Sequence, residues 1–169
     1  IREVLRTLLE AAVLVVLVGL GAGWQMLTPT AASRNEAPPF TVRTLDGKTQ
    51  RLSDLRGRPV LLDFWATWCA PCRASLPNLD AMQRRYGARG LVVLGLSVDD
   101  DGPVAVRRFV DRLGVRFPIA MAEEKVLADY GPIRTIPTTI LINRRGQVVR
   151  RVVGYLDEET LDGYVREIL

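Results

Sequence analysis

The two cysteines of this chain, Cys69 and Cys72, lie three positions apart in the stretch FWATWCAPC, and the 169 residues contain no others. Such a pair fits three kinds of site: a structural disulfide, a metal site or a redox-active dithiol. A disulfide around so short a loop removes only about 2 kcal/mol of unfolded-state entropy. Structural zinc takes four ligands, and with no histidine in the sequence only carboxylates would complete the set. The spacing therefore favours a redox-active pair without a metal.

A strand and a helix are predicted on either side of the cysteines and would position them. The apolar run PVLLDFW, residues 59–65, is typical of a buried strand, and a helical stretch follows over residues 70–86. Cys69 then lies at a helix N-terminus, where free N–H groups and the helix dipole stabilise a thiolate. Pro71 fits the first turn, because its missing N–H costs nothing there. We expect Cys69 to be the accessible nucleophile and Cys72, one turn later, to be the sheltered thiol that resolves a mixed disulfide.

The composition limits the other chemistry that the chain carries. The absence of histidine removes the commonest general base and every Ser–His or Cys–His nucleophile. Hydrophobic residues make up 48% and charged residues 25%, which is typical of a packed globular domain. The 23 basic and 19 acidic residues give a net charge of +4, and the arginines are scattered, so no nucleic-acid partner is expected.

Strands and helices alternate from Phe40 onward. The patterns predict a hairpin that turns at Asp46–Gly47, a buried strand over 91–98 and a helix over 103–113. This helix would present Val106, Phe109, Val110 and Leu113 on one face and end at Gly114. A short helix over 125–130, a hairpin of strands 138–143 and 147–154, and a helix over 157–169 capped by Asp157 are expected to follow. This order indicates an α/β fold with a mixed central sheet covered by helices on both faces.

The first 38 residues are expected to lie outside this domain. Residues 11–24 are apolar without interruption but span only about 21 Å as a helix, short of the ~30 Å hydrocarbon core. We therefore predict an apolar helix within residues 1–27 that is a signal-anchor or a signal peptide, and we favour a retained anchor. Two arginines precede the apolar run, which directs the following domain to the outer face of the membrane. Residues 28–38 are expected to be a linker, and residues 39–169 the domain.

Two signatures resemble a known family. DFWATWCAPC (residues 63–72) resembles the active-site signature of thioredoxins, and IPTTILINRRGQVV (residues 136–149) matches the second signature of the TlpA/ResA/DsbE group, the membrane-anchored thioredoxin-like proteins of bacterial envelopes. The order of elements across residues 40–169 is similar to that group. The resemblance implies a thioredoxin-like fold and a thiol–disulfide oxidoreductase that needs no cofactor beyond the Cys69–Cys72 disulfide. It also implies client proteins with disulfides or CxxC thiols, and an upstream membrane electron donor.

The resemblance assigns roles to residues around the cysteines. Pro137 falls where the family keeps a cis-proline beside the cysteines, and the backbone of its neighbour Ile136 would pair with an incoming peptide. Trp68, immediately before Cys69, is the expected contact surface for a client. Ala70 and Pro71 are expected to contribute to the same substrate-binding surface.

Asp63 interrupts an apolar run, and a buried carboxylate needs a reason. The thioredoxin match implies a proton acceptor for Cys72, and burial is expected to raise the pKa of Asp63 towards the working pH. The alternative is a buried aspartate with satisfied hydrogen bonds and no catalytic role. The envelope reductants often carry glutamate three residues after the second cysteine, and many carry asparagine at the Asp63 position. This chain has Ser75 in place of that glutamate, so either Asp63 supplies the acid from the thioredoxin-like position or proton transfer is left mainly to water.

The leading functional hypothesis is an envelope oxidoreductase that reduces client disulfides. Potentials of about −270 mV, as in thioredoxin, and about −120 mV, as in a strong oxidant, differ by about 7 kcal/mol for two electrons. Ala70 and Pro71 place no cation between the thiols to favour the reduced form, so we expect the reducing end of this range. The expected clients are apocytochrome c, during cytochrome c maturation, or cysteines of copper sites during metal-site assembly.

Two other functions fit the sequence less well. One is an assembly or binding module of the same fold with little turnover, but redox-linked copper carriers of this fold usually add a histidine. The other is a thiol peroxidase, which usually has a Thr-x-x-Cys motif, whereas Ala66 stands three residues before Cys69.

Overall fold

The computed structural model of the protein describes residues 35–131 and 133–169. The apolar helix predicted within residues 1–27, and most of the linker after it, lie outside these residues. Within the described ranges, none of the helices has the length and apolar character needed to cross a membrane.

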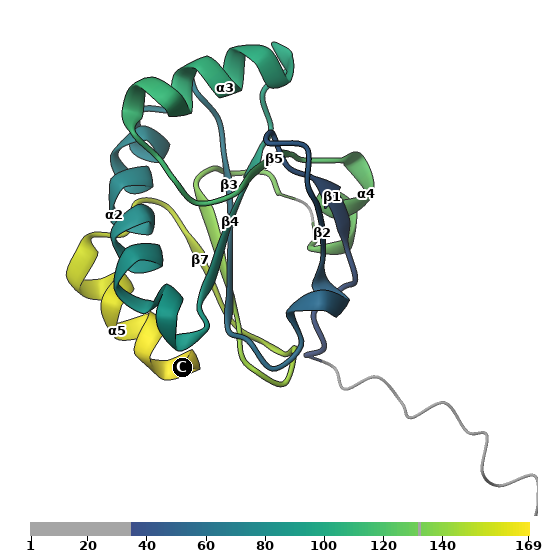
Figure 1. Cartoon of the computed structure of the whole chain (residues 1–169), viewed down its shortest axis with the longest axis vertical. Coiled ribbons are helices and arrows are strands. Elements are labelled where there is room, and N and C mark those ends of the chain that lie inside the picture. The colour runs from purple at the N-terminus through teal and green to yellow at the C-terminus, as the bar shows by residue number, and fades with distance from the viewer. Residues whose placement is uncertain (1–34, 132) are drawn as a thin grey trace, which may run out of the picture. The chain divides into compact units, whose positions relative to one another are not determined.

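A five-stranded sheet forms the centre of the fold, in the order β5-β4-β3-β6-β7 (Figure 1). Its strands are β3 (Val60–Trp65), β4 (Val92–Ser97), β5 (Ile119–Met121), β6 (Thr138–Ile142) and β7 (Val148–Val153). Strands β3, β4 and β5 are parallel, whereas β6 runs antiparallel to both β3 and β7. A separate antiparallel hairpin consists of β1 (Thr41–Arg43) and β2 (Thr49–Arg51). The predicted mixed sheet is confirmed.

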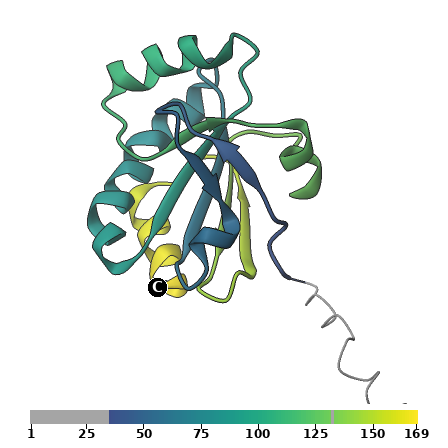
Figure 2. The same cartoon turned by 45° about the vertical axis from the view of Figure 1, so that its right-hand side comes forward.

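Helices cover both faces of this sheet. Helices α2 (Ala70–Tyr86), α3 (Gly102–Leu113) and α5 (Glu158–Ile168) lie on one face, and α4 (Glu124–Asp129) lies with the β1–β2 hairpin on the other (Figures 1 and 2). Two short 3-10 helices, η2 (Leu52–Leu55) and η3 (Gly87–Arg89), follow β2 and α2. The apolar core is divided accordingly into one cluster beneath α2, α3 and α5 and another beneath α4 and the hairpin.

The central strands β3 and β4 are buried along their whole length. Because alternate residues of a strand point to opposite faces, Leu61 and Trp65 enter the cluster beneath α2, whereas Leu62 and Phe64 enter the other. Asp63 lies between Leu61 and Trp65 and therefore points to the α2 face. Both cysteines belong to the cluster on that face.

Gly95 on β4 is required by close packing at the same level of the sheet. A Cβ atom at this position would lie 2.6 Å from Ile119 Cδ1, 3.0 Å from Trp65 Nε1 and 3.1 Å from Phe117 Cε2. The missing side chain therefore leaves the space that the Trp65 indole fills. Trp65 is fully buried and packs against Phe109, with 5.9 Å between the ring centroids. It is a core residue directly below the loop that leads to the cysteines.

Two details within the domain differ from the prediction. Strand β5 was not expected, because three residues are too few to show a strand period. Leu113 was expected on the buried face of α3, yet it is 39% exposed while Val106 and Val110 are buried. Leu113 is the last residue of α3, and the chain turns away from the core at Gly114, whose φ of +74° ends the helix.

The boundary between linker and domain is also corrected. Residues 35–38 were assigned to the linker, but they belong to the folded unit. The N–H of Val148 donates to the carbonyl of Asn35 at 2.7 Å, and the N–H of Ala37 donates to the carbonyl of Gly146 at 2.8 Å. Ala37 is 5% exposed. Residues 35–37 are held by pairing next to the start of β7, and the carbonyl of Pro38 accepts a hydrogen bond from the Tyr130 hydroxyl at 2.8 Å. A local composition argument does not reveal these long-range contacts.

Candidate redox-active site

Cys69 and Cys72 form a disulfide at the start of α2, with 5.2 Å between their Cα atoms. Cys69 occupies the position that caps the helix, and its sulfur accepts a hydrogen bond from the backbone N–H of Cys72 at 3.2 Å. Cys69 is 6% exposed, and Cys72 is fully buried. In the reduced protein the same N–H and the helix dipole would stabilise a Cys69 thiolate. The predicted position of Cys69 at a helix N-terminus is confirmed.

An exposed rim surrounds Cys69. Trp68 is 66% exposed, and Ala70 and Pro71 are also exposed. Trp68 and Ala70 flank Cys69 in the sequence, and Pro71 precedes Cys72, so they present apolar contact area beside the redox pair. Cys69 therefore lies next to exposed side chains, whereas the buried Cys72 is shielded.

The segment before β6 lies at the same end of the sheet as the cysteines. Thr138 pairs with Phe64 near the end of β3, and the chain leaves β3 there to reach Cys69. The Ile136–Pro137 peptide bond is cis, as the resemblance implied. Neither backbone group of Ile136 has a hydrogen-bond partner among the described residues.

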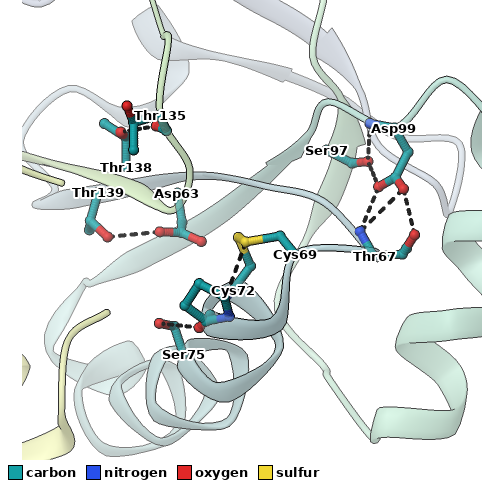
Figure 3. Close-up of a disulfide and its surroundings, with 11 residues drawn as sticks. Asp63, Thr67, Cys69, Cys72, Ser75, Ser97, Asp99, Thr135, Thr138 and Thr139 are labelled. Carbon is teal, nitrogen blue, oxygen red and sulfur yellow. Dashed lines mark hydrogen bonds between the residues drawn. A yellow bond between two sulfur atoms is a disulfide. The ribbon is translucent and has the colours of Figure 1, made fainter. Parts of the chain in front are cut away.

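Asp63 is a fully buried carboxylate with one hydrogen bond. The hydroxyl of Thr139, its register partner on β6, donates to Asp63 Oδ1 at 2.7 Å, and Oδ2 has no partner among the described residues. Figure 3 shows this second oxygen pointing toward the disulfide. Burial raises the pKa of Asp63 to about 7, and the Thr139 hydrogen bond lowers it in part. The expected rise of this pKa is confirmed.

Ser75 supplies no acid to the site. It is buried on α2, and its hydroxyl donates to the carbonyl of Pro71, one turn earlier, at 3.1 Å. The hydroxyl is therefore engaged by its own helix. Of the two acid positions considered from the sequence, only Asp63 holds a carboxylate on the face beneath α2.

A second buried aspartate, Asp99, approaches the site from the other side and was not anticipated from the sequence. Both of its carboxylate oxygens accept the backbone N–H of Thr67, two residues before Cys69, at 3.2 and 3.0 Å. The hydroxyls of Thr67 and Ser97 donate to the same carboxylate at 2.5 and 2.7 Å (Figure 3). The available signal was the polar pair Ser97-x-Asp99 at the end of a buried strand.

The arrangement defines a class of protein. A sheet of thioredoxin type positions a CxxC disulfide at the start of a helix, with one sulfur near the surface, the other buried, and a carboxylate of raised pKa beneath them. These parts suffice for exchange between a dithiol and a disulfide. The site is that of a thiol–disulfide oxidoreductase.

Comparison with known proteins gives the family. The model of the AhpC/TSA family matches residues 34–151. The thiol-disulfide oxidoreductase ResA of Bacillus anthracis is 37% identical over 134 residues, which cover 79% of this chain and 76% of that protein. ResA of Geobacillus thermodenitrificans is 32% identical over 172 residues, covering 99% of this chain and 96% of that protein.

Solved structures agree with this result. A thiol:disulfide interchange protein of the thioredoxin family from Chlorobium tepidum is 29% identical and superposes with a TM-score of 0.75, covering 82% of this chain and 99% of that one. The chain therefore belongs to the AhpC/TSA family, and it is a thiol–disulfide oxidoreductase of the TlpA/ResA/DsbE type.

Proposed function

We propose that this protein reduces disulfides of client proteins on the outer face of the cytoplasmic membrane, where an N-terminal apolar helix anchors it. The proposed clients are apocytochrome c or the cysteines of metal sites under assembly. The observation that carries the proposal is the pairing of a rim-exposed Trp68 with a nearly buried Cys69, which supports a protein-sized substrate. A small-molecule thiol would not need such a rim.

The proposed reaction is two successive exchanges. The Cys69 thiolate attacks one sulfur of the client disulfide, which breaks that bond, forms a mixed disulfide and releases one client thiolate that takes up a proton. Cys72 then loses its proton to Asp63, and its thiolate attacks Cys69 Sγ. The second client thiolate leaves, and the Cys69–Cys72 disulfide forms. The second client thiolate takes up the proton that Asp63 gives up, so the client has gained two electrons and two protons. A membrane dithiol donor must then supply two further electrons to reduce the Cys69–Cys72 disulfide, and it becomes a disulfide itself.

The substrate assignments follow the same geometry. The client strand would run along the Ile136 backbone, whose groups have no partner among the described residues, and would contact Trp68, Ala70 and Pro71. Main-chain pairing gives affinity without demanding a particular sequence. This arrangement supports several clients that share an accessible disulfide.

The direction of the reaction is proposed to be reductive. The residues between the cysteines, Ala70 and Pro71, carry no charge that would stabilise a thiolate and so favour the reduced form. A protein at the reducing end of the range passes electrons to a client disulfide, and it needs the membrane donor to stay reduced in an oxidising compartment.

Trapping the mixed disulfide tests the client assignment. A Cys72→Ala variant, expressed as the full chain, should accumulate on clients through Cys69, and the trapped proteins should release on reduction. The matched control is Cys69→Ala, which retains one thiol at the buried position and should trap nothing. Equal capture by both variants would contradict the roles of the two cysteines.

Turnover separates the oxidoreductase from the binding module. With dithiothreitol as electron source, the parent should accelerate insulin disulfide reduction, and both single cysteine variants should lose this activity. Binding of clients without turnover by the parent would favour the assembly module instead.

Membrane topology is tested with the full chain. Alkaline phosphatase fused after Leu169 should be active in cells, because the proposed anchor places the domain outside. A reporter that works only in the cytoplasm should be silent at the same position. The reverse pattern would refute the proposed location.

A further inference from the structure

The turn between β3 and α2 determines where Cys69 stands. It consists of residues 66–68, and its internal hydrogen bond runs from the N–H of Cys69 to the carbonyl of Ala66 at 3.2 Å. Trp68 within this turn points to solvent. The polar contact that fixes the turn to the rest of the domain is made by Thr67.

Asp99 binds Thr67 through hydrogen bonds to both its backbone and its side chain. The Thr67 N–H is shared between the two carboxylate oxygens, and the Thr67 hydroxyl adds a further hydrogen bond. Asp99 is only 7% exposed. Hydrogen bonds to a charged acceptor are roughly twice as strong as those between neutral groups. The carboxylate is therefore a strong anchor for the residue two positions before Cys69.

Asp99 is itself fixed to the sheet. The hydroxyl of Ser97, the last residue of β4, donates to Asp99 Oδ2 at 2.7 Å and accepts the backbone N–H of Asp99 at 3.2 Å. The N–H of Val98 donates to the carbonyl of Trp65 at 2.9 Å, which joins the ends of β4 and β3. The anchor thus connects the turn to the rigid centre of the domain.

No cation balances this carboxylate within the described residues, where Asp99 has no ion pair. It also forms no hydrogen bond with either cysteine. An uncompensated buried carboxylate is costly unless hydrogen bonds satisfy it. Three donors do so here, and two of them belong to Thr67. The carboxylate and the turn therefore depend on each other.

We propose that Asp99 is a positioning residue for the Cys69–Cys72 couple: by anchoring Thr67 it keeps Cys69 within bonding reach of Cys72 and so stabilises the disulfide over the dithiol. The inference deepens the oxidoreductase activity of this site. A disulfide between neighbouring cysteines is stable in proportion to the effective concentration of one thiol at the other, and that concentration falls when either partner gains freedom. Loosening the turn should therefore make the couple more oxidising.

The test measures the couple alone, without a client. The oxidised protein is equilibrated with a mixture of reduced and oxidised dithiothreitol. In this exchange the protein disulfide and one reduced dithiothreitol give the protein dithiol and one cyclic dithiothreitol disulfide. We expect Asp99→Ala to shift this equilibrium about tenfold toward the protein dithiol, which corresponds to about 30 mV. The neighbouring exposed Asp100→Ala is the matched control and should match the parent.

A conservative variant separates anchoring from charge. Asp99→Asn keeps an acceptor oxygen for the Thr67 N–H but removes the negative charge, so its equilibrium should stay within about threefold of the parent. If Asp99→Asn shifts the equilibrium as far as Asp99→Ala does, the charge and not the anchor is responsible, and the proposal is wrong.

Folding is controlled separately. Near-ultraviolet circular dichroism establishes that each variant is folded, and an unchanged equilibrium in a folded Asp99→Ala protein overturns the proposal. If Asp99→Ala does not fold, Thr67→Val takes its place, because it removes only the hydroxyl bond to the carboxylate. A shift in the same direction, of about threefold, supports the proposal, and no shift refutes it. Because this equilibrium contains no client protein, these outcomes do not depend on the proposed cellular clients.

Discussion

Asp63 and Asp99 are buried aspartates on the two sides of one disulfide, and their surroundings differ sharply. Asp63 lies within β3 and receives a single hydrogen bond, from Thr139, while its other oxygen is without a partner among the described residues. Asp99 follows β4 and receives hydrogen bonds from the N–H and hydroxyl of Thr67 and from the hydroxyl of Ser97. Both carboxylates are more than nine-tenths buried.

The difference shows how hydrogen bonding decides what a buried acid does. A carboxylate with few donors loses the solvation of its charge, so its pKa rises, as it does for Asp63. A carboxylate with several donors holds its surroundings in place. We infer that the poorly satisfied acid exchanges protons beneath Cys72, and that the well satisfied acid sets the position of Cys69.

The largest expected effect is on stability as a function of pH. The folded-state pKa of Asp63, about 7, lies above the unfolded value near 4, so folding takes up a proton between these pH values and the parent loses stability as pH rises through this window. Asp63→Asn lacks this loss. Its free energy of unfolding should therefore exceed that of the parent by an amount that grows with pH, to at most about 4 kcal/mol above pH 7. Urea unfolding of the oxidised proteins at pH 4 to 8 measures it.

The control for this experiment is Asp100→Asn, an exposed position where the curve should follow the parent. A difference between Asp63→Asn and the parent that does not change with pH would show that Asp63 does not titrate in this range.

The next effect is on the release of a client from the mixed disulfide. If Asp63 accepts the proton of Cys72, the rate of release should rise with pH through about 7 in the parent. In Asp63→Asn the rate of release should be about 10–100-fold lower at neutral pH and should no longer rise with pH through about 7. Single-turnover measurements with a labelled client peptide give the rate at each pH. Equal rates across neutral pH would make Asp63 a structural residue.

A smaller effect is expected from Thr139→Val, which removes the hydrogen bond that lowers the pKa of Asp63 while keeping the shape of the side chain. The pKa should rise further, so the midpoint of the client-release profile should move to higher pH. Above that midpoint the variant should lose about 1–2 kcal/mol of stability. In a background of Asp63→Asn, the same substitution should leave the pH profile unchanged. A midpoint that stays in place would show that the hydroxyl does not act on Asp63.

The smallest effect is expected from a change next to Asp99. Ser97→Ala removes one contact that fixes Asp99 but leaves both bonds from Thr67 and the backbone bond from Val98 to Trp65, so the anchor of the turn is weakened and not lost. We expect a loss of about 1 kcal/mol in the free energy of unfolding and a dithiothreitol equilibrium that shifts by less than the roughly threefold change expected of Thr67→Val. A large shift of that equilibrium would mean that Ser97, rather than Thr67, carries the coupling to Cys69.

The local features of this site could be predicted from the sequence. The apolar run of β3, the helix from Ala70 and the proline in its first turn are all encoded by neighbouring residues, and they suffice to place Cys69 at a helix N-terminus. The cap of α5 is similarly local, since Asp157 accepts the N–H of Thr160 as predicted. Such features depend on contacts within one helical turn or one strand period, which a sequence pattern displays directly.

The contacts around the disulfide, in contrast, join residues that are far apart in the chain. Asp63 and Thr139 are 76 positions apart, and Thr67 and Asp99 are 32 apart. Their contacts depend on the order and register of β6, β3 and β4 in the sheet. Strand β5 and the pairing of residues 35–37 next to β7 also depend on neighbours distant in the chain. A register shift of one residue would turn each strand's side chains to the opposite face, so the partners of the two aspartates are properties of the assembled sheet.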